Sequence, residues 1–230
     1  MKLSLIISFS LLYTFSVFSQ DKVMDLSDFQ ELSASTSVKI DLIQSNENKI
    51  EIDIVKGDLE DLRIEESGDQ LKIYWKSRKG PNWGNNRKAN ITLYHNGFDE
   101  IDVSAGANVY SNDVIKSDEF DAHVNSGGSL ELELDAGEVD VHVNSGGSFK
   151  AEGVAETLEV DADSGGFFGG YKLKAKHVDA SANSGGAAKV FASESIKARV
   201  NSGGSVKYKG EPKDKNLKKD KWSGGSISEY

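Results

Sequence analysis

The sequence predicts an all-β protein: a right-handed parallel β-helix, or β-solenoid, of about nine coils, with two short strands per coil and Gly-Gly corners. Three observations predict this fold. A four-residue motif of the Asn-Ser-Gly-Gly type recurs along the second half of the chain, its copies lie 18 to 21 residues apart, and the segments beside it alternate apolar and polar residues. Parallel crossover connections are almost always right-handed, which predicts the hand.

The chain of 230 residues begins with a segment typical of a secretory signal peptide, residues 1–19. Lys2 supplies the positive charge, residues 3–18 are mainly apolar, and residues 17–19 suit a cleavage site, so the mature protein is expected to begin at Gln20. The alternative is a membrane anchor, but the apolar run is short and Ser-rich for a spanning helix. We expect an exported protein that is not membrane-spanning and resides in the periplasm, on the outer-membrane surface or outside the cell.

Residues 20–230 are predicted to form a single β-solenoid domain, in which residues 20–103 make irregular N-terminal coils. Period-two alternation is typical of a strand with one buried face. In this part of the chain it occurs at residues 38–42, 50–54, 71–75 and 91–94.

Residues 104–230 are predicted to form the Ser-Gly-Gly repeat coils. One coil alone cannot bury its apolar side, whereas coils stacked about 4.8 Å apart share a continuous core. The Gly pair permits the backbone conformations of a sharp corner, and stacked Asn amides can hydrogen-bond along their column. A phosphate or calcium cradle is the alternative role for these loops. The corner residues are Asn125, Gly127, Gly128, Asn144, Gly146, Gly147, Asp163, Gly165, Gly166, Asn183, Gly185, Gly186, Asn201, Gly203 and Gly204.

The composition excludes several classes of protein. The chain has no Cys, which excludes a disulfide scaffold, a Cys-ligated zinc site and a thiol nucleophile. Its net charge of −10 argues against nucleic acid as a partner, because phosphate binding needs a basic surface.

Charge is segregated along the predicted solenoid. Residues 99–163 contain 17 acidic and 2 basic residues, whereas residues 164–230 contain 6 acidic and 13 basic residues. The middle of the solenoid is therefore expected to be acidic and its C-terminal end basic. The basic end includes residues 213–221, expected as a loop that leads to the last strand.

Alignment of the corners predicts two outward columns of side chains on neighbouring coils. One column contains Glu100, Asp121, Asp140, Glu159, Asp179 and Lys197, and the other Asp102, His123, His142, Asp161, Ser181 and Arg199. Asp102, His123, His142 and Asp161 combine carboxylates with imidazoles, so they are the candidate metal ligands. The alternative is a solvated acidic face without an ion. No cofactor is predicted.

A segment outside the repeat, residues 77–87, supplies the candidate ligand-binding residues Trp83 and Arg87. An exposed Trp among Asn and Arg residues can stack on the face of a sugar. The alternative is an insertion that binds no ligand.

The ladder of Ser-Gly-Gly corners, together with residues 29–42, 68–73, 191–198, 205–212 and 222–227, resembles the family called putative auto-transporter adhesin, head GIN domain. The resemblance covers residues 28–228. It implies an exported, single-stranded bacterial β-helix and no catalytic residues. The corners in that family are more often Gly-Ser-Gly.

We therefore expect a non-catalytic envelope or surface binding module, adhesin-like, whose partner is an extracellular or periplasmic polymer such as a glycan, or a protein. One alternative is a carbohydrate-active enzyme, since parallel β-helices also carry lyases and hydrolases. Its carboxylate pairs would be residues such as Asp140 and Asp161, but glycoside hydrolysis needs two carboxyls in different environments. Another alternative is a structural or assembly role. The atypical terminal coils favour a monomer or small oligomer.

Overall fold

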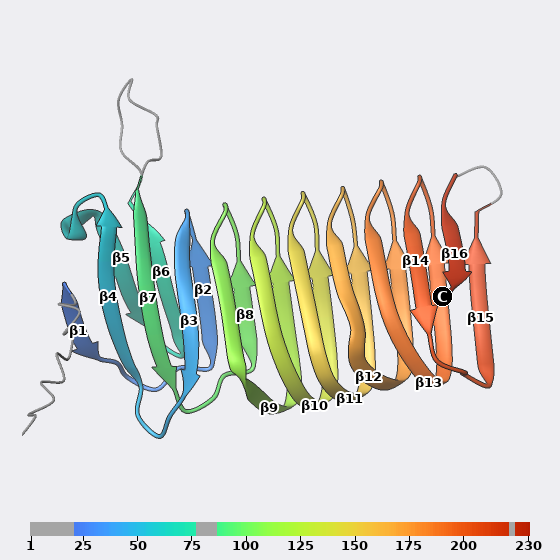
Figure 1. Ribbon diagram of the computed structural model, residues 1–230, viewed down its shortest axis with the longest axis horizontal. Helices are drawn as coiled ribbons and strands as arrows, with labels where there is room; N and C mark the ends of the chain where they lie inside the picture. The colour runs from blue at the N-terminus through green and yellow to red at the C-terminus, as the bar shows by residue number, and fades with distance from the viewer. Residues whose placement is uncertain (1–20, 77–86, 221–223) are drawn as a thin grey trace, which may run out of the picture.

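The structure is a computed structural model that describes residues 21–76, 87–220 and 224–230, and it shows an elongated solenoid of two β-layers (Figure 1). The coils are parallel and number about seven. Each coil descends in the front layer and rises in the rear layer while it advances from left to right in Figure 1, so the solenoid is right-handed, as predicted. The predicted signal peptide, residues 1–19, and Trp83 lie outside the described residues.

The front layer begins with strands from the irregular N-terminal part and continues with the first halves of the repeat coils (Figure 1). Its order is β1 (Lys22–Asp25), β4 (Lys49–Lys56), β7 (Lys88–His95), β3 (Val38–Gln44), β9 (Asn108–Val124), β10 (Ser129–Val143), β11 (Ser148–Ala162), β12 (Phe167–Ala182), β13 (Ala187–Val200), β14 (Ser205–Lys209) and β16 (Ser226–Glu229).

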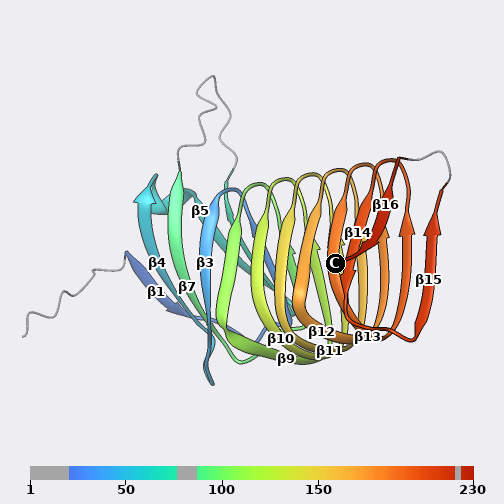
Figure 2. The ribbon, with the colours of Figure 1, turned by 45° about the vertical axis from the view of Figure 1, so that its right-hand side comes forward.

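The rear layer contains the second halves of β9 to β13, flanked on both sides by shorter strands. On the N-terminal side these are β5 (Leu62–Ser67), β6 (Gln70–Trp75), β2 (Glu31–Ser35) and β8 (Glu100–Val103), and on the C-terminal side β15 (Asp214–Lys219). A single 3-10 turn, η1 (Leu59–Asp61), precedes β5. Figure 2 shows how the upper corners align along the molecule.

The two strands predicted for each repeat coil run together as one bent strand in β9 to β13. Pairing between β10 and β11 continues through the lower bend, from Leu134 opposite Gly153 to Glu138 opposite Thr157. Gly137 lies at this bend, where a Cβ atom would come 2.6 Å from the carbonyl oxygen of Asp118 in the preceding coil. The lower bends therefore depend on close backbone packing between coils.

The upper corners are tight turns in which the two glycines have different roles. In the corner after β9, the N–H of Gly128 donates to the carbonyl of Asn125 at 2.9 Å. Ser126 and Gly127 have φ values of 50° and 74°, and positive φ at both central residues is typical of a type I′ turn. A Cβ atom on Gly128 would lie 2.5 Å from the carbonyl oxygen of Val103 in the preceding coil. The first glycine thus accommodates the turn, and the second allows coils to approach.

The corner Asn residues connect coils through their backbone rather than through a side-chain ladder. The N–H of Asn125 donates to the carbonyl of Val103 at 3.0 Å, and that of Asn144 donates to Val124 at 3.0 Å. In the part of the chain that the structure describes, the corner Asn side chains form no amide ladder from coil to coil. The described residues therefore do not form the amide ladder that stacked Asn side chains permit, and the backbone N–H groups link the coils instead.

The inward side chains of all coils form one continuous core. Residues in the repeat strands β10 and β11 are buried in largely alternating positions, so stacked coils place apolar side chains above one another. Phe149 and Phe168 lie in one such column, with ring centroids 5.5 Å apart. Phe98 and Phe120 meet at 6.0 Å in another.

The prediction of about nine coils was too high, because the N-terminal part contains antiparallel pairs as well as coil strands. β4 pairs antiparallel with both β1 and β7, and β5 pairs antiparallel with β6. β2 and β3, joined at a corner formed by Thr36 and Ser37, build a regular coil there, because each pairs parallel with strands on both sides. Period-two alternation is the same in parallel and antiparallel strands, so the sequence pattern could not separate them.

The segment expected as a loop at residues 213–221 contains strand β15. β15 pairs parallel with β13, from Ser195 opposite Asp214 to Val200 opposite Lys219. All six of its residues are exposed, and five of them are polar. Its sequence therefore lacks the apolar–polar alternation from which a strand could be predicted. The open backbone edge of β13 provides its hydrogen-bond partners instead.

Candidate functional site

The rear layer carries the two predicted outward columns, which we call the charged ladder. The strand register places the members of each column opposite one another on β8 to β13. Like charges one rung apart, about 4.8 Å, repel by about 1 kcal/mol in water, less with salt. This repulsion is small enough for the charged ladder to remain a solvated surface without a bound ion. Its acidic part also attracts cations.

At the N-terminal end of the ladder, Glu100, Asp102 and His123 come together. Each offers a ligand atom, and these atoms all lie within 4.8 Å of one another. Burial raises the pKa of the Glu100 carboxyl above its ordinary value of 4.5, the nearby carboxylates of Glu31, Asp102 and Asp121 raise it further, and His123 lowers it. Negative charge is thus concentrated at this point.

In the middle of the ladder, His142 lies between two carboxylates. Its Nε2 atom is 3.5 Å from Asp140, and its Nδ1 atom is 3.6 Å from Asp161. The His123 and His142 rings stack with centroids 5.0 Å apart and an interplanar angle of 3°. The four predicted metal ligands therefore divide into two groups: Asp102 and His123 join Glu100, whereas His142 and Asp161 join Asp140.

At its C-terminal end the ladder is neutralised by basic residues. Asp179 accepts from Lys197 at 2.7 Å and lies 3.2 Å from Arg199. The Ser181 hydroxyl donates to Asp161. Burial raises the pKa of the Glu159 carboxyl, as do the neighbouring acidic residues of the ladder, while Arg199 lowers it. The ladder thus changes from acidic to basic along the solenoid, as the segregated charge predicts.

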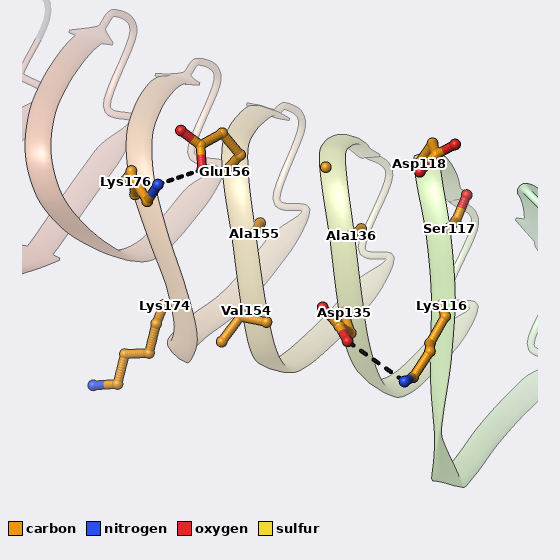
Figure 3. Close-up of a pocket in the computed structure, with 11 residues that line it drawn as sticks. Lys116, Ser117, Asp118, Asp135, Ala136, Val154, Ala155, Glu156, Lys174 and Lys176 are labelled. Atoms are coloured by element: carbon orange, nitrogen blue, oxygen red, sulfur yellow. Dashed lines mark ion pairs between the residues drawn. The ribbon is translucent and has the colours of Figure 1, made fainter.

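A groove of about 740 Å³ follows the lower bends of β9 to β12 (Figure 3). Ala136 and Ala155 contribute small side chains to it, and charged side chains flank it. Lys176 pairs with Glu156 at 2.7 Å, and Lys116 lies 3.9 Å from Asp135 (Figure 3). These charges already have partners of opposite sign. The groove therefore has no net charge that would select an anionic or a cationic ligand.

The front layer carries an aromatic–lysine cluster near its C-terminal end: the rings of Phe167, Tyr171, Phe191 and Tyr230 with the ammonium groups of Lys174, Lys189 and Lys209. Lys174 lies 3.9 Å from the Phe191 ring centroid, and Lys209 lies 4.6 Å and 4.4 Å from those of Tyr171 and Tyr230. The two tyrosine rings are 5.4 Å apart.

Sequence reasoning did not find this cluster. Its members come from β12, from β13, from the end of β14 and from the residue after β16, and they are not adjacent in the sequence. The register shift between Gly169 and Lys174 also displaces β12 relative to its neighbours. The available signal was an aromatic residue at an outward position directly after a corner, as at Phe167.

Arg87, one of the two predicted ligand-binding residues, is held by the fold. Its guanidinium lies 5.3 Å from the Trp75 ring centroid, donates to the carbonyl of Lys76 at 2.7 Å and lies 4.0 Å from Asp61. Only 14% of its side chain is exposed. The other predicted residue, Trp83, lies outside the described residues.

Within the described ranges, no helix has the length and apolar character needed to cross a membrane. No curated protein matches the chain.

Solved structures similar to this chain share its fold. A putative adhesin from Bacteroides fragilis is 25% identical, with a TM-score of 0.78, over 91% of this chain and 95% of that one. A putative adhesin from Parabacteroides merdae is 18% identical, with a TM-score of 0.68 and the same shares of both chains. A protein of Parabacteroides distasonis described as a putative lipid binding protein is 19% identical, with a TM-score of 0.67, again over 91% and 95%.

The family model described as "Putative auto-transporter adhesin, head GIN domain" matches residues 28–212, which is most of the chain. The sequence resemblance noted above is thereby confirmed. The chain belongs to the family of the putative auto-transporter adhesin, head GIN domain.

Proposed function

We propose that this protein is a non-catalytic, exported, adhesin-like module that binds an acidic polysaccharide on the front layer of its solenoid. The family supports an adhesin-like surface role. The observation that carries the choice of ligand is the aromatic–lysine cluster. Aromatic rings stack on the apolar faces of sugars, and lysine ammonium groups pair with their carboxylate or sulfate groups.

The shape of the cluster favours an extended polymer over a small molecule. Its residues spread across β12, β13, β14 and the residue after β16, which are neighbours in one sheet.

An anionic membrane surface is a less suitable ligand for the same cluster. Membrane-binding surfaces insert protruding apolar side chains into the lipid interface. Here Phe167, Tyr171 and Phe191 are only partly exposed, and each has a lysine ammonium near its ring. Tyr230 is the one ring of the cluster that is largely exposed, at 79%, so a single aromatic side chain and not an apolar patch is available for insertion.

The carboxylates of the charged ladder give little support to the enzymatic alternative. A glycosidase needs one carboxyl that stays protonated and one that stays ionised, in different environments. Asp140 and Asp161 instead flank the same imidazole of His142 at 3.5 Å and 3.6 Å.

The test measures binding of the mature protein to three acidic polysaccharides, namely alginate, hyaluronan and heparin, with dextran as the neutral comparison. We expect at least one acidic polysaccharide to bind and dextran not to bind. Tyr171→Ala and Lys209→Gln should each weaken that binding at least tenfold. Tyr110→Ala is the matched control, because Tyr110 also lies on the front layer with a lysine, Lys39, 4.9 Å from its ring centroid.

The proposal is overturned if none of the three acidic polysaccharides binds, or if Tyr171→Ala binds as tightly as the wild type. Vesicles of phosphatidylserine and phosphatidylcholine form a further arm. Binding to the vesicles that depends on Tyr171, without binding to any polysaccharide, would assign the cluster to a membrane surface instead.

A further inference from the structure

The cluster of Glu100, Asp102 and His123 has the composition and spacing of a divalent metal site. Glu100 and Asp102 project from β8, and the register places His123 of β9 directly opposite Asp102. Their ligand atoms lie within 4.8 Å of one another. Zinc bonds to nitrogen and oxygen are about 2.0–2.2 Å long, so small side-chain rotations would let one ion contact all three residues.

We infer that Glu100, Asp102 and His123 bind a divalent transition-metal ion, of the zinc class, on the rear layer of the solenoid. The site lies on the opposite layer from the aromatic–lysine cluster and does not depend on the proposed polysaccharide binding.

His123 differs from the two other outward histidines in its partners. His142 lies within 3.6 Å of carboxylates on two sides, and His177 contacts the Ser195 hydroxyl at 2.9 Å. Among the described residues, the nitrogen atoms of His123 have no hydrogen-bond or ion-pair partner. A neutral imidazole nitrogen without a partner is free to act as a metal ligand.

The surroundings of the cluster favour a cation further. A groove of about 360 Å³ lies beside it, lined by Gln30, Glu31, Asp99, Glu100, Glu119 and Asp121. Five of these six residues are acidic. Carboxylates this close together repel one another. A bound divalent ion would offset this repulsion at the point where the carboxylates are most crowded.

The ligand set distinguishes zinc from calcium. Calcium takes six to eight oxygen ligands, whereas imidazole nitrogen is a common ligand of zinc and other late first-row metals. Binding that requires His123 is therefore the property that separates this site from general attraction of cations to the acidic ladder.

The test is a titration of the mature protein, without a histidine tag, with zinc alone and with calcium alone. Calorimetry gives the affinity, and the NMR signals of the histidine rings identify the ligand. We expect one zinc ion to bind and the His123 ring signals to shift first. His123→Gln and Glu100→Gln should each weaken zinc binding at least tenfold.

Two matched variants complete the experiment. His177→Gln removes another exposed imidazole and should leave the zinc affinity within twofold of the wild type. His142→Gln should leave it within threefold. Circular dichroism and thermal unfolding show that each variant is folded. The inference is overturned if His123→Gln binds zinc as the wild type does, if His142→Gln loses affinity equally, or if calcium binds more tightly than zinc.

Discussion

The two glycines of the upper corner after β9 are each costly to substitute, but for different physical reasons. Gly127 has a φ of 74° and open space around its missing Cβ atom, so its cost on substitution is backbone strain. Gly128 is buried against the carbonyl of Val103, so its cost is a steric clash between coils. Substitution of Gly127 therefore tests backbone strain within one turn, and substitution of Gly128 tests packing between neighbouring coils.

We predict that Gly127→Ala lowers the free energy of unfolding by about 1 kcal/mol, the usual cost of a left-handed Ala. Gly128→Ala should lower it by about 3 kcal/mol, because the Val103 carbonyl must move and its hydrogen bond to Asn125 is disturbed. Urea unfolding of the two variants measures both values. Equal losses would contradict the assignment of different roles.

The raised pKa of Glu100 predicts a pH dependence of stability. A carboxyl whose pKa is higher in the folded protein than in the unfolded chain stabilises the fold below the unfolded value, about 4.5, and loses that contribution as pH rises through the folded value. Glu100→Gln removes this loss. With EDTA present, the stability of the variant relative to the wild type should increase when the pH is raised from 4 to 7. Urea unfolding at both pH values measures this difference. If the variant were more stable relative to the wild type at pH 4 than at pH 7, the pKa of Glu100 would be lowered and not raised.

At the scale of the element, β15 protects the C-terminal edge of the rear layer. All six of its residues are exposed, and three of them are lysines: Lys215, Lys218 and Lys219. An edge strand has free backbone groups that can pair with another chain, and lysines along the edge oppose such pairing. The end of the solenoid is thus built against end-to-end association.

We predict that Lys218→Thr combined with Lys219→Thr produces concentration-dependent association. The measurement is solution scattering over a range of concentrations, with the wild type expected to remain a monomer or small oligomer. Lys150→Thr combined with Lys172→Thr is the matched control, because these lysines lie on interior strands. If the control pair associates as strongly as the edge pair, loss of positive charge rather than edge exposure is the cause.

The rear halves of the repeat coils could be predicted from the sequence down to the individual residue pair, whereas the front halves contain register shifts. The corner motif sets the frame and alternation assigns the faces, so Asp121 opposite Asp140 and His123 opposite His142 follow directly. The N-terminal antiparallel pairs could not be predicted, because alternation does not report strand direction. β15 could not be predicted either, since its pairing is determined by the open edge of β13 and not by its own residues.

The candidate sites were predictable to different degrees. Asp102 and His123 were found because the columns place them on adjacent rungs. Glu100 was assigned to a column but not to the ligand set, because the reach of a side chain along its own strand is not visible in the sequence. The aromatic–lysine cluster was missed because a register shift in β12 creates it together with residues from β13, β14 and the position after β16.

At the scale of the whole molecule, the solenoid presents two long faces with different chemistry. The rear layer carries the charged ladder, acidic over β8 to β12, and the front layer carries the aromatic–lysine cluster near its C-terminal end. Figure 1 shows the strands of the two layers. One repeat specifies both faces, because each repeat coil places outward side chains on both layers and the coils stack in parallel. The proposed polysaccharide and metal sites both depend on this stacking.

The most direct test of the stacking uses the absence of Cys from the chain. Ser129 lies opposite Ser148 on the adjacent coil, whereas Ser205 lies four coils along the same column, about 19 Å from Ser129. A disulfide requires Cα atoms no more than about 7 Å apart. We predict that Ser129→Cys with Ser148→Cys oxidises to an intramolecular disulfide, and that Ser129→Cys with Ser205→Cys retains two free thiols. A disulfide within the monomer of the second variant, or free thiols in the first, would contradict the stacked parallel coils.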